Sequence, residues 1–170
     1  MDKRLETLLA KQAIGELSSR YMRGLDRRDR DLLLAQFGGD GWCEYGFMNA
    51  SSTELIDFAL QALANHVANQ HLIGNTLIDV EGNEAYGEVY FQAYHKVPSE
   101  AGFDDMIIAG RYIDRYKCRE GTWKLAYRSE VVDWSRSSPS NDPYFELVPN
   151  TLRGGRQDDP VYRLDNRRRP

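Results

Sequence analysis

The first third of the chain carries apolar residues at a helical spacing. Between Arg4 and Leu25 they recur every three to five residues, which is the repeat of an amphipathic helix. A charged segment at 26–31 interrupts this repeat, and residues 32–37 then predict a short second helix that a Gly-Gly pair ends. Residues 42–47 predict a short strand.

Beyond this strand the pattern changes from one further helix to long alternating segments. A Ser-Ser-Thr-Glu sequence at 51–54 has the residues of a capped helix start and predicts a third helix over 55–63. Two pairs of segments with a period of two follow, and a short glycine-containing turn joins each pair. These segments are 71–80 with 85–97, and 106–118 with 122–135. We expect residues 98–105 to form a loop that could cover a cavity.

The order of the elements, with helices first and antiparallel hairpins later, defines the expected fold class. It predicts an α+β domain in which N-terminal helices pack on one face of a curved antiparallel sheet. Such a sheet wraps around the helices into a cone whose mouth can hold a small molecule. With 170 residues the chain suits one domain, which we expect over 1–136. Residues 137–170 are polar and then aperiodic, so we expect an extension that packs on the domain or on a dimer partner.

Composition and charge exclude several classes of protein. With 41% hydrophobic and 28% charged residues, the chain can bury a core. The net charge of -4 disfavours a broad nucleic-acid interface, and the Asn-Arg-Arg-Arg-Pro sequence at 166–170 is expected to be a solvated tail. No apolar run approaches the length of a membrane span, and the N-terminus lacks the apolar block of a signal peptide. We therefore expect a soluble, cytoplasmic protein that binds neither nucleic acid nor membrane.

The sequence carries no common motif for a metal, a nucleotide or a serine nucleophile. Its two cysteines, Cys43 and Cys118, cannot form a disulfide framework and lie in no CxxC motif. The three histidines, His66, His71 and His95, lack the spacing of a ligand set on one helix face, and most of them are expected to be structural or exposed. The GxGxxG, P-loop, HExxH and GxSxG motifs do not occur. We therefore expect no metal and no cofactor, so that any catalysis comes from side chains alone.

Three polar residues are candidates for chemistry, although each alone has a simpler structural explanation. Asp26 follows an apolar helix face, and alone it is better explained as a residue that ends the helix. His71 opens a strand, where a structural histidine is as good an explanation as a base. Arg128 lies in the last hairpin, where a surface ion pair is the simplest explanation. Arg111 occupies a similar strand position, and only one of the two arginines needs to face inward.

Longer segments around these residues resemble the SnoaL-like branch of the NTF2-like superfamily. The resemblance covers about residues 5–134 and implies the cone-shaped fold. It rests on the segments YMRGLDRRD at 21–29, QHLIGN at 70–75, GRY at 110–112 and GTWKLAYR at 121–128. Within the superfamily the chain is similar to enzymes of the scytalone dehydratase and hexachlorocyclohexane dehydrochlorinase type. This similarity implies an Asp-His dyad at Asp26 and His71 and a cavity arginine at Arg128.

The same resemblance extends to one further group and includes one difference. The chain is also similar to the lignin diarylpropane lyases, which eliminate formaldehyde from an aromatic diol without a cofactor. The dehydratase pattern has a second cavity histidine, for which His66 and His95 are poor substitutes. Dehydration, dehydrohalogenation and deformylation all begin with proton removal and end with a leaving group, so one set of residues could support any of them.

The residue types at the three candidate positions suit such an elimination. A buried Asp26 that accepts a hydrogen bond from one imidazole nitrogen of His71 raises the basicity of the other nitrogen, which can take a proton from substrate. His71 is then the base and Asp26 its orienting partner. The guanidinium of Arg128, or of Arg111 as the alternative, can stabilise an oxyanion or a departing group without a metal.

Aromatic residues supply the expected wall of the pocket, although an aromatic stripe is more often core than ligand site. On the segment 85–97, Tyr86, Tyr90 and Tyr94 alternate with small and apolar residues, and either face of this segment can be the inner one. Tyr21 is the tyrosine expected nearest the dyad. The full set of expected substrate-binding residues is Tyr21, Trp42, Tyr45, Phe47, Tyr90, Tyr94, Arg111 and Trp134.

One main functional hypothesis and two alternatives follow. We expect a cofactor-independent lyase that acts on a hydrophobic, aromatic small molecule of the lignin-derived diarylpropane type, with loss of water, halide or formaldehyde. The alternatives are a non-catalytic small-molecule-binding module and an accessory subunit like the small chain of aromatic-ring dioxygenases. A homodimer or homotrimer is expected, because an exposed sheet face with Ile107, Ile113 and Val131 would otherwise leave an apolar patch in water.

Overall fold

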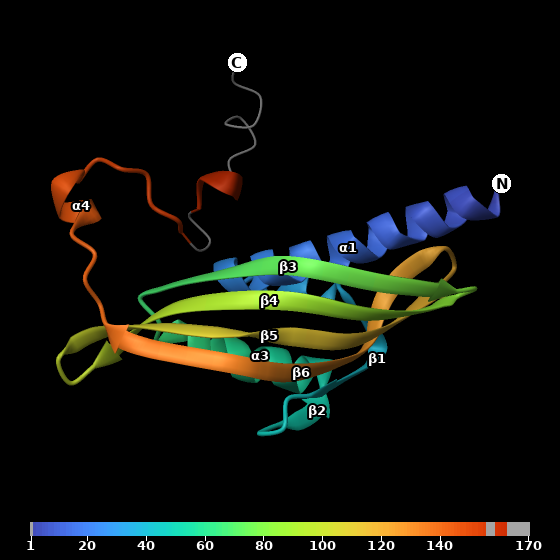
Figure 1. The fold of residues 1–170 in the computed structure, drawn as a ribbon, viewed down its shortest axis with the longest axis horizontal. Helices are drawn as coiled ribbons and strands as arrows, with labels where there is room; N and C mark the ends of the chain where they lie inside the picture. The colour runs from blue at the N-terminus through green and yellow to red at the C-terminus, as the bar shows by residue number, and fades with distance from the viewer. Residues whose placement is uncertain (1, 156–158, 163–170) are drawn as a thin grey trace, which may run out of the picture.

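A curved sheet and a layer of helices against one of its faces make up the molecule (Figure 1). The computed structural model describes residues 2–155 and 159–162. The helices are α1 (Lys3–Arg27), α2 (Arg30–Leu34), α3 (Ser52–Ala64) and α4 (Tyr144–Leu147), with a short 3-10 helix at Pro160–Tyr162. The strands are β1 (Phe37–Glu44), β2 (Asn49–Ser51), β3 (Ala68–Glu81), β4 (Glu84–Ser99), β5 (Gly102–Arg119) and β6 (Thr122–Pro139). This arrangement confirms the predicted α+β class.

The six strands form one sheet in the order β2-β1-β6-β5-β4-β3. Neighbouring strands run antiparallel except β1 and β6, which are parallel, so the predicted antiparallel sheet is in fact mixed. The parallel pair arises because the chain passes through α3 and the long hairpins before β6 returns beside β1. The predicted loop at 98–105 is wrong, since β4 and β5 stay paired as far as Ser99 and Gly102 and leave only a two-residue turn.

Burial along β4 shows which face of the sheet meets the helices. Val89, Phe91 and Ala93 are buried, whereas the residues between them keep more exposure. We call the helix-covered side the inner face and the opposite side the outer face. Small residues on the inner face leave room for large side chains of neighbouring strands. A Cβ on Gly87, for example, would lie only 2.9 Å from the ring of Tyr116.

The long helix α1 brings its C-terminal end close to the start of β3 (Figure 1). Arg28 ends this helix in the left-handed conformation, with φ of 50°. Asp29 then caps α2, because its carboxylate accepts a hydrogen bond from the amide of Leu32. Asp29 therefore takes the capping role between the two helices, and Asp26 is left to make other contacts.

Helix α3 begins with the predicted cap and covers the inner face. The hydroxyl of Ser51 accepts a hydrogen bond from the amide of Glu54, whose carboxylate accepts one from the amide of Ser51. Such a reciprocal pair satisfies two amides that the first helical turn would leave unpaired. Leu55 and Ile56 follow directly and are buried in the core that α1 and the sheet share.

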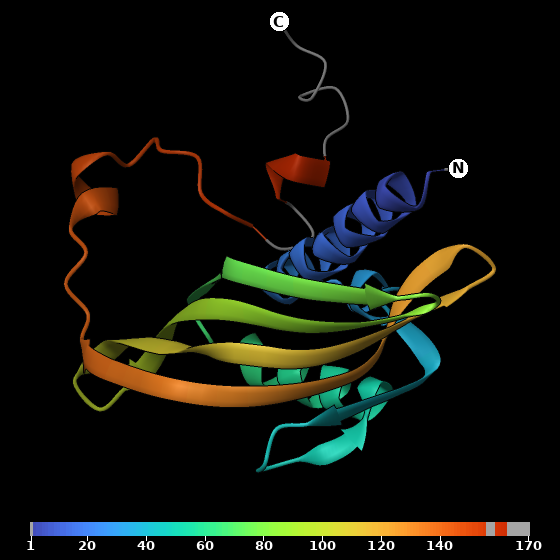
Figure 2. The ribbon, with the colours of Figure 1, turned by 45° about the vertical axis from the view of Figure 1, so that its right-hand side comes forward.

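Beyond β6 the chain turns away from the sheet and then comes back to the end of α1 (Figure 2). Asp159 is buried there and forms an ion pair with Arg27 at 3.1 Å. The hydroxyl of Tyr162 donates a hydrogen bond to Oδ2 of Asp29 at 3.0 Å. The described end of the extension thus packs on the helix end. The predicted solvated tail at 166–170 lies outside the described residues.

Candidate active site

Asp26 and His71 meet where the end of α1 approaches the start of β3. The Nδ1 atom of His71 lies 2.7 Å from Oδ1 of Asp26, and the backbone amide of His71 donates to the same oxygen at 3.0 Å. The side-chain amide of Asn69 donates to it as well, at 3.1 Å. Only 14% of the Asp26 side chain and 7% of the His71 side chain are exposed. The two residues that the resemblance pairs are therefore in direct contact and largely buried.

This geometry fixes which imidazole nitrogen can act on a ligand. With the carboxylate at Nδ1, the proton of the neutral ring lies on Nδ1 and points to Asp26, which leaves the lone pair of Nε2 free. The negative charge of Asp26 also stabilises the imidazolium that forms when Nε2 takes a proton. A pair arranged in this way leaves Nε2 of His71 able to accept a proton from a ligand.

Two further histidines lie beside the dyad, which corrects the prediction that His66 and His95 are poor candidates for this site. The ring of His95 lies edge-on to that of His71, with centroids 5.2 Å apart, and its Nδ1 is 3.1 Å from Nδ1 of His66. His95 faces inward because side chains alternate along a strand, and His95 is an even number of residues away from the other buried residues of β4. Burial, with the neighbouring histidines, lowers the pKa of His95 to about 3. His95 is therefore neutral near pH 7 and adds no positive charge beside His71.

Arg128 lies on the inner face of β6 and is fully buried. Its Nε and Nη2 atoms donate to the two carboxylate oxygens of Asp114 on β5, at 2.8 and 2.7 Å. Its guanidinium lies against the rings of both Tyr21 and Tyr112, with the ring centroids 4.4 and 4.0 Å away. Burial alone would lower the pKa of Arg128, but the charge and hydrogen bonds of Asp114 raise it well above its ordinary value. The arginine therefore stays charged inside the protein.

An aromatic cluster connects the buried arginine with the rim of the cone. Tyr112 stacks on Phe91 at a centroid distance of 4.6 Å and approaches Tyr45 at 6.4 Å. The hydroxyl oxygens of Tyr45 and Tyr21 are 3.2 Å apart. Tyr45 also lies edge-on to Phe47, which is 71% exposed. Of the predicted wall, Tyr21 and Tyr45 thus lie on the inner side and Phe47 at its rim, and Tyr21, expected nearest the dyad, packs on the arginine.

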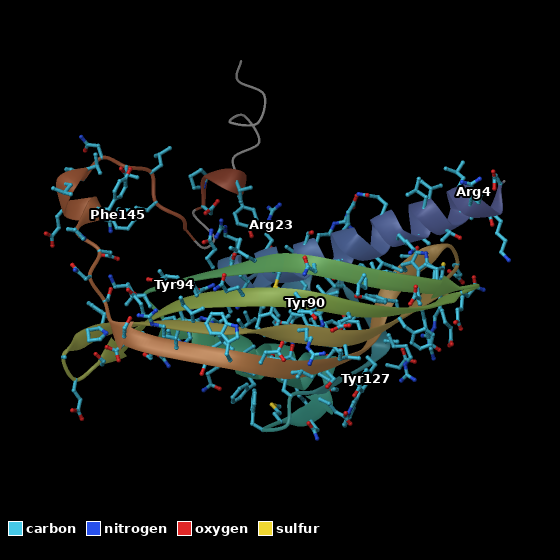
Figure 3. All side chains as sticks on the ribbon, viewed as in Figure 1. Arg4, Arg23, Tyr90, Tyr94, Tyr127 and Phe145 are labelled. Atoms are coloured by element: carbon cyan, nitrogen blue, oxygen red, sulfur yellow. The ribbon has the colours of Figure 1, made fainter. Side chains whose placement is uncertain are left out.

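Five predicted wall residues lie on the outer face of the sheet, which corrects their assignment to the inner wall. They are Trp42, Tyr90, Tyr94, Arg111 and Trp134. Figure 3 shows Tyr90 and Tyr94 on the face of β4 that is turned away from α1 and α3. Arg111 forms ion pairs there with Glu88 and Asp133, so Arg128 is the arginine that faces inward. The physical reason is strand alternation, which places these residues opposite the buried positions.

A groove of about 770 Å³ opens beside the dyad, between the sheet edge and the C-terminal extension. Asp26, Asn69 and Tyr94 line it from the domain, and Phe145 and Arg153 line it from the extension. Phe145 is labelled on α4 in Figure 3. The volume is in the range of small-molecule sites, and it gives Tyr94 a place near the dyad despite its position on the outer face.

The sequence of the chain also matches the model of a known domain family. A model of the SnoaL-like domain matches residues 6–129, which is more than half of the chain. The chain belongs to the SnoaL-like family. A comparison with curated proteins gives no significant match.

Solved structures of low sequence identity share the fold of this SnoaL-like chain. A type 2 hexachlorocyclohexane dehydrochlorinase superimposes with a TM-score of 0.73 at 19% identity, over 82% of this chain and 95% of its own. A provisionally assigned scytalone dehydratase from Novosphingobium aromaticivorans gives 0.69 at 23% identity, over 79% and 91%. A protein of unknown function from Nostoc punctiforme gives 0.61 at 24% identity, over 74% and 92%. These similarities show a common fold.

Sequence reasoning misses two carboxyl groups on the inner face of this SnoaL-like chain. Asp114 holds the arginine, as described above. Glu130 lies opposite Tyr112 in the pairing of β5 with β6, which places it on the inner face as well. Burial raises the pKa of Glu130 to about 7, although the charge of Arg128 acts against the shift. One signal in the sequence could have indicated Glu130. It lies two residues after Arg128 on a predicted strand, so the two side chains share a face.

The described residues include a buried thiol at Cys43, and they contain neither a cluster of metal-ligating side chains nor a helix that could span a membrane. Across residues 2–155 and 159–162, no group of three or more His, Cys, Asp and Glu side chains is arranged to hold a metal ion. Burial raises the pKa of Cys43 to about 12, so this thiol is not a nucleophile near pH 7. Within the same ranges, no helix combines the length and the apolar character that crossing a membrane requires.

Proposed function

We propose that this SnoaL-like chain is a cofactor-independent lyase for hydrophobic, aromatic small molecules. The contact between Asp26 and His71 carries the proposal, because a buried carboxylate 2.7 Å from Nδ1 leaves Nε2 as a base. Arg128 supplies a buried positive charge on the same inner face. An elimination needs a base to take a proton and a cation to stabilise developing negative charge, and these residues offer both.

The reaction begins when Nε2 of His71 takes a proton from a carbon atom of the bound substrate. In loss of water or hydrogen halide, the electron pair of the broken C–H bond forms a carbon–carbon double bond and the leaving group departs with its own bonding pair. In loss of formaldehyde, the base takes the proton of the terminal hydroxyl group instead, the O–H pair forms the C=O bond of formaldehyde, and the pair of the broken C–C bond forms the carbon–carbon double bond as hydroxide leaves the neighbouring carbon. Asp26 stabilises the imidazolium through the hydrogen bond at Nδ1. His95 is neutral beside it and causes no charge repulsion. Solvent then takes the proton from His71 and restores the base.

Arg128 stabilises the negative charge that develops on the substrate. Its Nη1 atom is buried and has no hydrogen-bond partner among the described residues, while Asp114 occupies Nε and Nη2. A buried guanidinium with one free donor favours an anionic oxygen or a halide in contact with it. Arg111 makes its ion pairs on the outer face and has no part in this step.

Aromatic side chains support an aromatic substrate. Tyr45 and Tyr112 lie on the inner side, and the exposed rings of Phe47 and Phe58 are 5.8 Å apart at the rim. Such rings stack on aromatic ligands and exclude water from them. A lignin-derived compound of the diarylpropane type fits this chemistry, with water, halide or formaldehyde as the leaving group.

The test is incubation of the purified, metal-free protein with lignin-derived diols, hydroxylated polyketides and chlorinated cyclohexanes, followed by mass spectrometry. We expect the wild type to release water, hydrogen chloride or formaldehyde from at least one compound. His71→Asn should release none. Glu88→Gln is the matched control, since Glu88 lies on the outer face, and it should match the wild type.

Three other outcomes would contradict the proposal or part of it. Turnover by His71→Asn at the wild-type rate would remove His71 as the base. A compound that co-elutes with the protein unchanged, with no product from any compound, would favour a non-catalytic binding module. Co-purification with an iron-sulfur subunit would favour the accessory role in a ring dioxygenase.

We further propose that the chain works in the cytoplasm as a homodimer or homotrimer. The outer face of the sheet exposes Tyr90, Ile113 and Trp134 at 37%, 40% and 50%. Large apolar side chains on one face favour burial against another protein surface. A second copy suits this face, because it carries both signs of charge at Arg111 and Glu88 and can complement itself. Light scattering of the wild type and of Trp134→Glu tests this, and a wild-type monomer at micromolar concentration would contradict it.

A further inference from the structure

Glu130 is a carboxyl group on the inner face that the reaction described above leaves unused. It lies on β6 directly opposite Tyr112 of β5 and two residues after Arg128. Side chains two residues apart on a strand point to the same side, so Glu130 and Arg128 share the inner face. Arg128 is fully buried, whereas Glu130 keeps part of its surface accessible. Glu130 therefore borders space that solvent can reach on the inner side of the sheet.

The groups around Glu130 leave its carboxyl unpaired. Among the described residues it has neither a hydrogen-bond partner nor an ion-pair partner. The titratable and charged groups of the surrounding inner face include Tyr21 of α1, Cys43 of β1, Tyr45 after β1, Tyr112, Asp114 and Tyr116 of β5, and Arg128 of β6. Arg128 is the positive charge in this set, and Asp114 already binds it through two hydrogen bonds. Arg128 would keep Glu130 ionised if the two formed an ion pair, but Arg128 is paired with Asp114 instead.

The acidity of Glu130 follows from this environment. Burial raises its pKa to about 7, and the attraction of Arg128 offsets that shift only in part. A carboxyl group with such a pKa is present in both protonation states near neutral pH, so it can give a proton and recover it. The neighbouring phenols are poorer proton donors near neutral pH. Burial raises the pKa of Tyr21, Tyr45 and Tyr112 above the ordinary value of a phenol, which is already about 10.

We propose that Glu130 is the general acid of this site and protonates an oxygen leaving group while His71 removes a proton from the adjacent carbon. The substrate class that this predicts is a β-hydroxy carbonyl compound with an aromatic substituent. The proposal rests on the lyase function proposed above. His71 and Glu130 both belong to the inner side, on β3 and β6 with β4 and β5 between them, so the proposal requires a substrate whose reacting carbon atoms lie between the two side chains.

The proposed step conserves atoms, charge and electrons. Nε2 of His71 takes the proton next to the carbonyl, and the electron pair of that C–H bond forms the carbon–carbon double bond. The C–O bond at the β carbon breaks, and its electron pair stays on the departing oxygen. That oxygen takes the proton of Glu130 and leaves as water. His71 is then protonated and Glu130 ionised, and proton exchange with solvent returns both to their starting states.

An acid in the site distinguishes two kinds of leaving group. Hydroxide departs readily only when it is protonated to water, so its loss depends on a proton donor. Chloride departs as an anion and needs no proton. Removal of the proton of Glu130 should therefore slow loss of hydroxide far more than loss of chloride.

The test uses two ketones with the same carbon skeleton. One is the aldol adduct of benzaldehyde and acetone, and the other carries chlorine in place of its hydroxyl group. Both give benzalacetone, whose absorbance reports kcat/KM after the rate without enzyme is subtracted. We expect Glu130→Gln to lower the ratio of hydroxide loss to chloride loss by about 100-fold or more. His71→Asn should lower both rates, and the outer-face control Glu88→Gln should lower neither.

Each other result decides against a specific part of the proposal. A ratio that is the same in Glu130→Gln and in the wild type overturns the acid role, whether both rates fall or neither does. Wild-type turnover of the chloro ketone alone also overturns the acid role, while the lyase function stands. Wild-type turnover of neither ketone refutes the lyase function for this class of compound, and the acid role of Glu130 fails with it.

A second measurement tests the protonated carboxyl without any turnover. At about pH 6 exposed carboxyl groups are ionised, so a carboxylic acid band in the infrared spectrum reports a carboxyl with a raised pKa. We expect this band in the wild type and its loss in Glu130→Gln, with circular dichroism as the check that the variant is folded. A wild-type spectrum without the band would overturn the proposal.

Discussion

The ring and the backbone amide of His71 both donate to one carboxylate oxygen of Asp26, at 2.7 and 3.0 Å. Asp26 lies at the end of α1 and His71 near the start of β3, so this oxygen connects the helix layer with the sheet. Asn69 donates to it as well. An ionised oxygen can accept several hydrogen bonds at once, and these three hold it in one position. The carboxylate that orients the ring of His71 is thus itself held by the backbone amide of His71.

Asp26→Asn should keep most of this geometry and remove the charge. The amide oxygen can still accept hydrogen bonds, but a neutral side chain no longer stabilises the imidazolium of His71. We expect kcat to fall about 100-fold or more, with little change in Tm. Turnover of the compound that mass spectrometry identifies and thermal unfolding by circular dichroism measure the two effects.

Asp29→Asn is the matched control for that experiment. Asp29 is three residues further along, caps α2 and accepts a hydrogen bond from Tyr162. Its substitution should lower Tm and leave kcat close to that of the wild type. Equal losses of kcat in the Asp26 and Asp29 variants would show that the charge of Asp26 has no special role.

The ion pair of Asp114 with Arg128 predicts a large loss of stability when one partner is removed. Both side chains are fully shielded from solvent. Asp114→Asn leaves an uncompensated charge in the core and should lower the free energy of unfolding by about 3–5 kcal/mol in a urea titration. The double variant Asp114→Leu with Arg128→Met should recover much of that loss, because apolar residues of similar volume can replace a buried pair. A loss below about 1 kcal/mol in the single variant would mean that the pair behaves like an exposed one.

Much of the fold could be predicted because hydrophobic repeats and turn residues act locally. The helix expected over 4–25, the capped helix start within 51–54 and the turns at 81–83 and 119–121 all lie where the sequence pattern predicts them. The parallel pairing of β1 with β6 could not be predicted, because it joins segments far apart in the sequence and no local pattern specifies it. The ends of the two strands within 98–105 were not predicted either, because the polar residues there resemble those of a loop.

The side chains that line the site were harder to predict than the pair of Asp26 and His71. On β4 both faces carry large rings, with Tyr90 on one side and Phe91 on the other, so alternation alone does not tell which side is inner. The small residues Gly87 and Ala93 are the useful signal, because a face that packs against helices and large neighbours needs space. His95 has the same parity as these small residues and is therefore on the inner side.

Acid should destabilise the protein in part through His95. Burial and the neighbouring histidines hold the pKa of His95 at about 3, below its ordinary value of about 6.5. Between these values the unfolded chain binds a proton that the folded protein does not, so the free energy of unfolding falls as the pH drops from about 6.5 to about 3. In His95→Asn this contribution is lost, and Tm should fall less steeply over that range than in the wild type. Parallel Tm curves for the two proteins would contradict the lowered pKa.

Gly110 marks the place where the pairing of β5 with β6 shifts register. Gly110 pairs with Val132, while the residue before it pairs with Trp134, so Asp133 is an extra residue in β6. A shift of one residue in a strand moves side chains to the opposite face. The bulge therefore helps to determine that Arg128 faces the inner side.

Gly110→Ala should damage both stability and the site. A Cβ at this position would lie 2.1 Å from the carbonyl oxygen of Val131, a backbone atom that cannot move without disturbing the strand pairing. We expect the free energy of unfolding to fall by about 3 kcal/mol or more. Gly39→Ala is the matched control, because a Cβ there meets nothing within 4 Å, and its urea midpoint should stay close to that of the wild type. Equal midpoints for the two variants would mean that the bulge accommodates a side chain and does not fix the register.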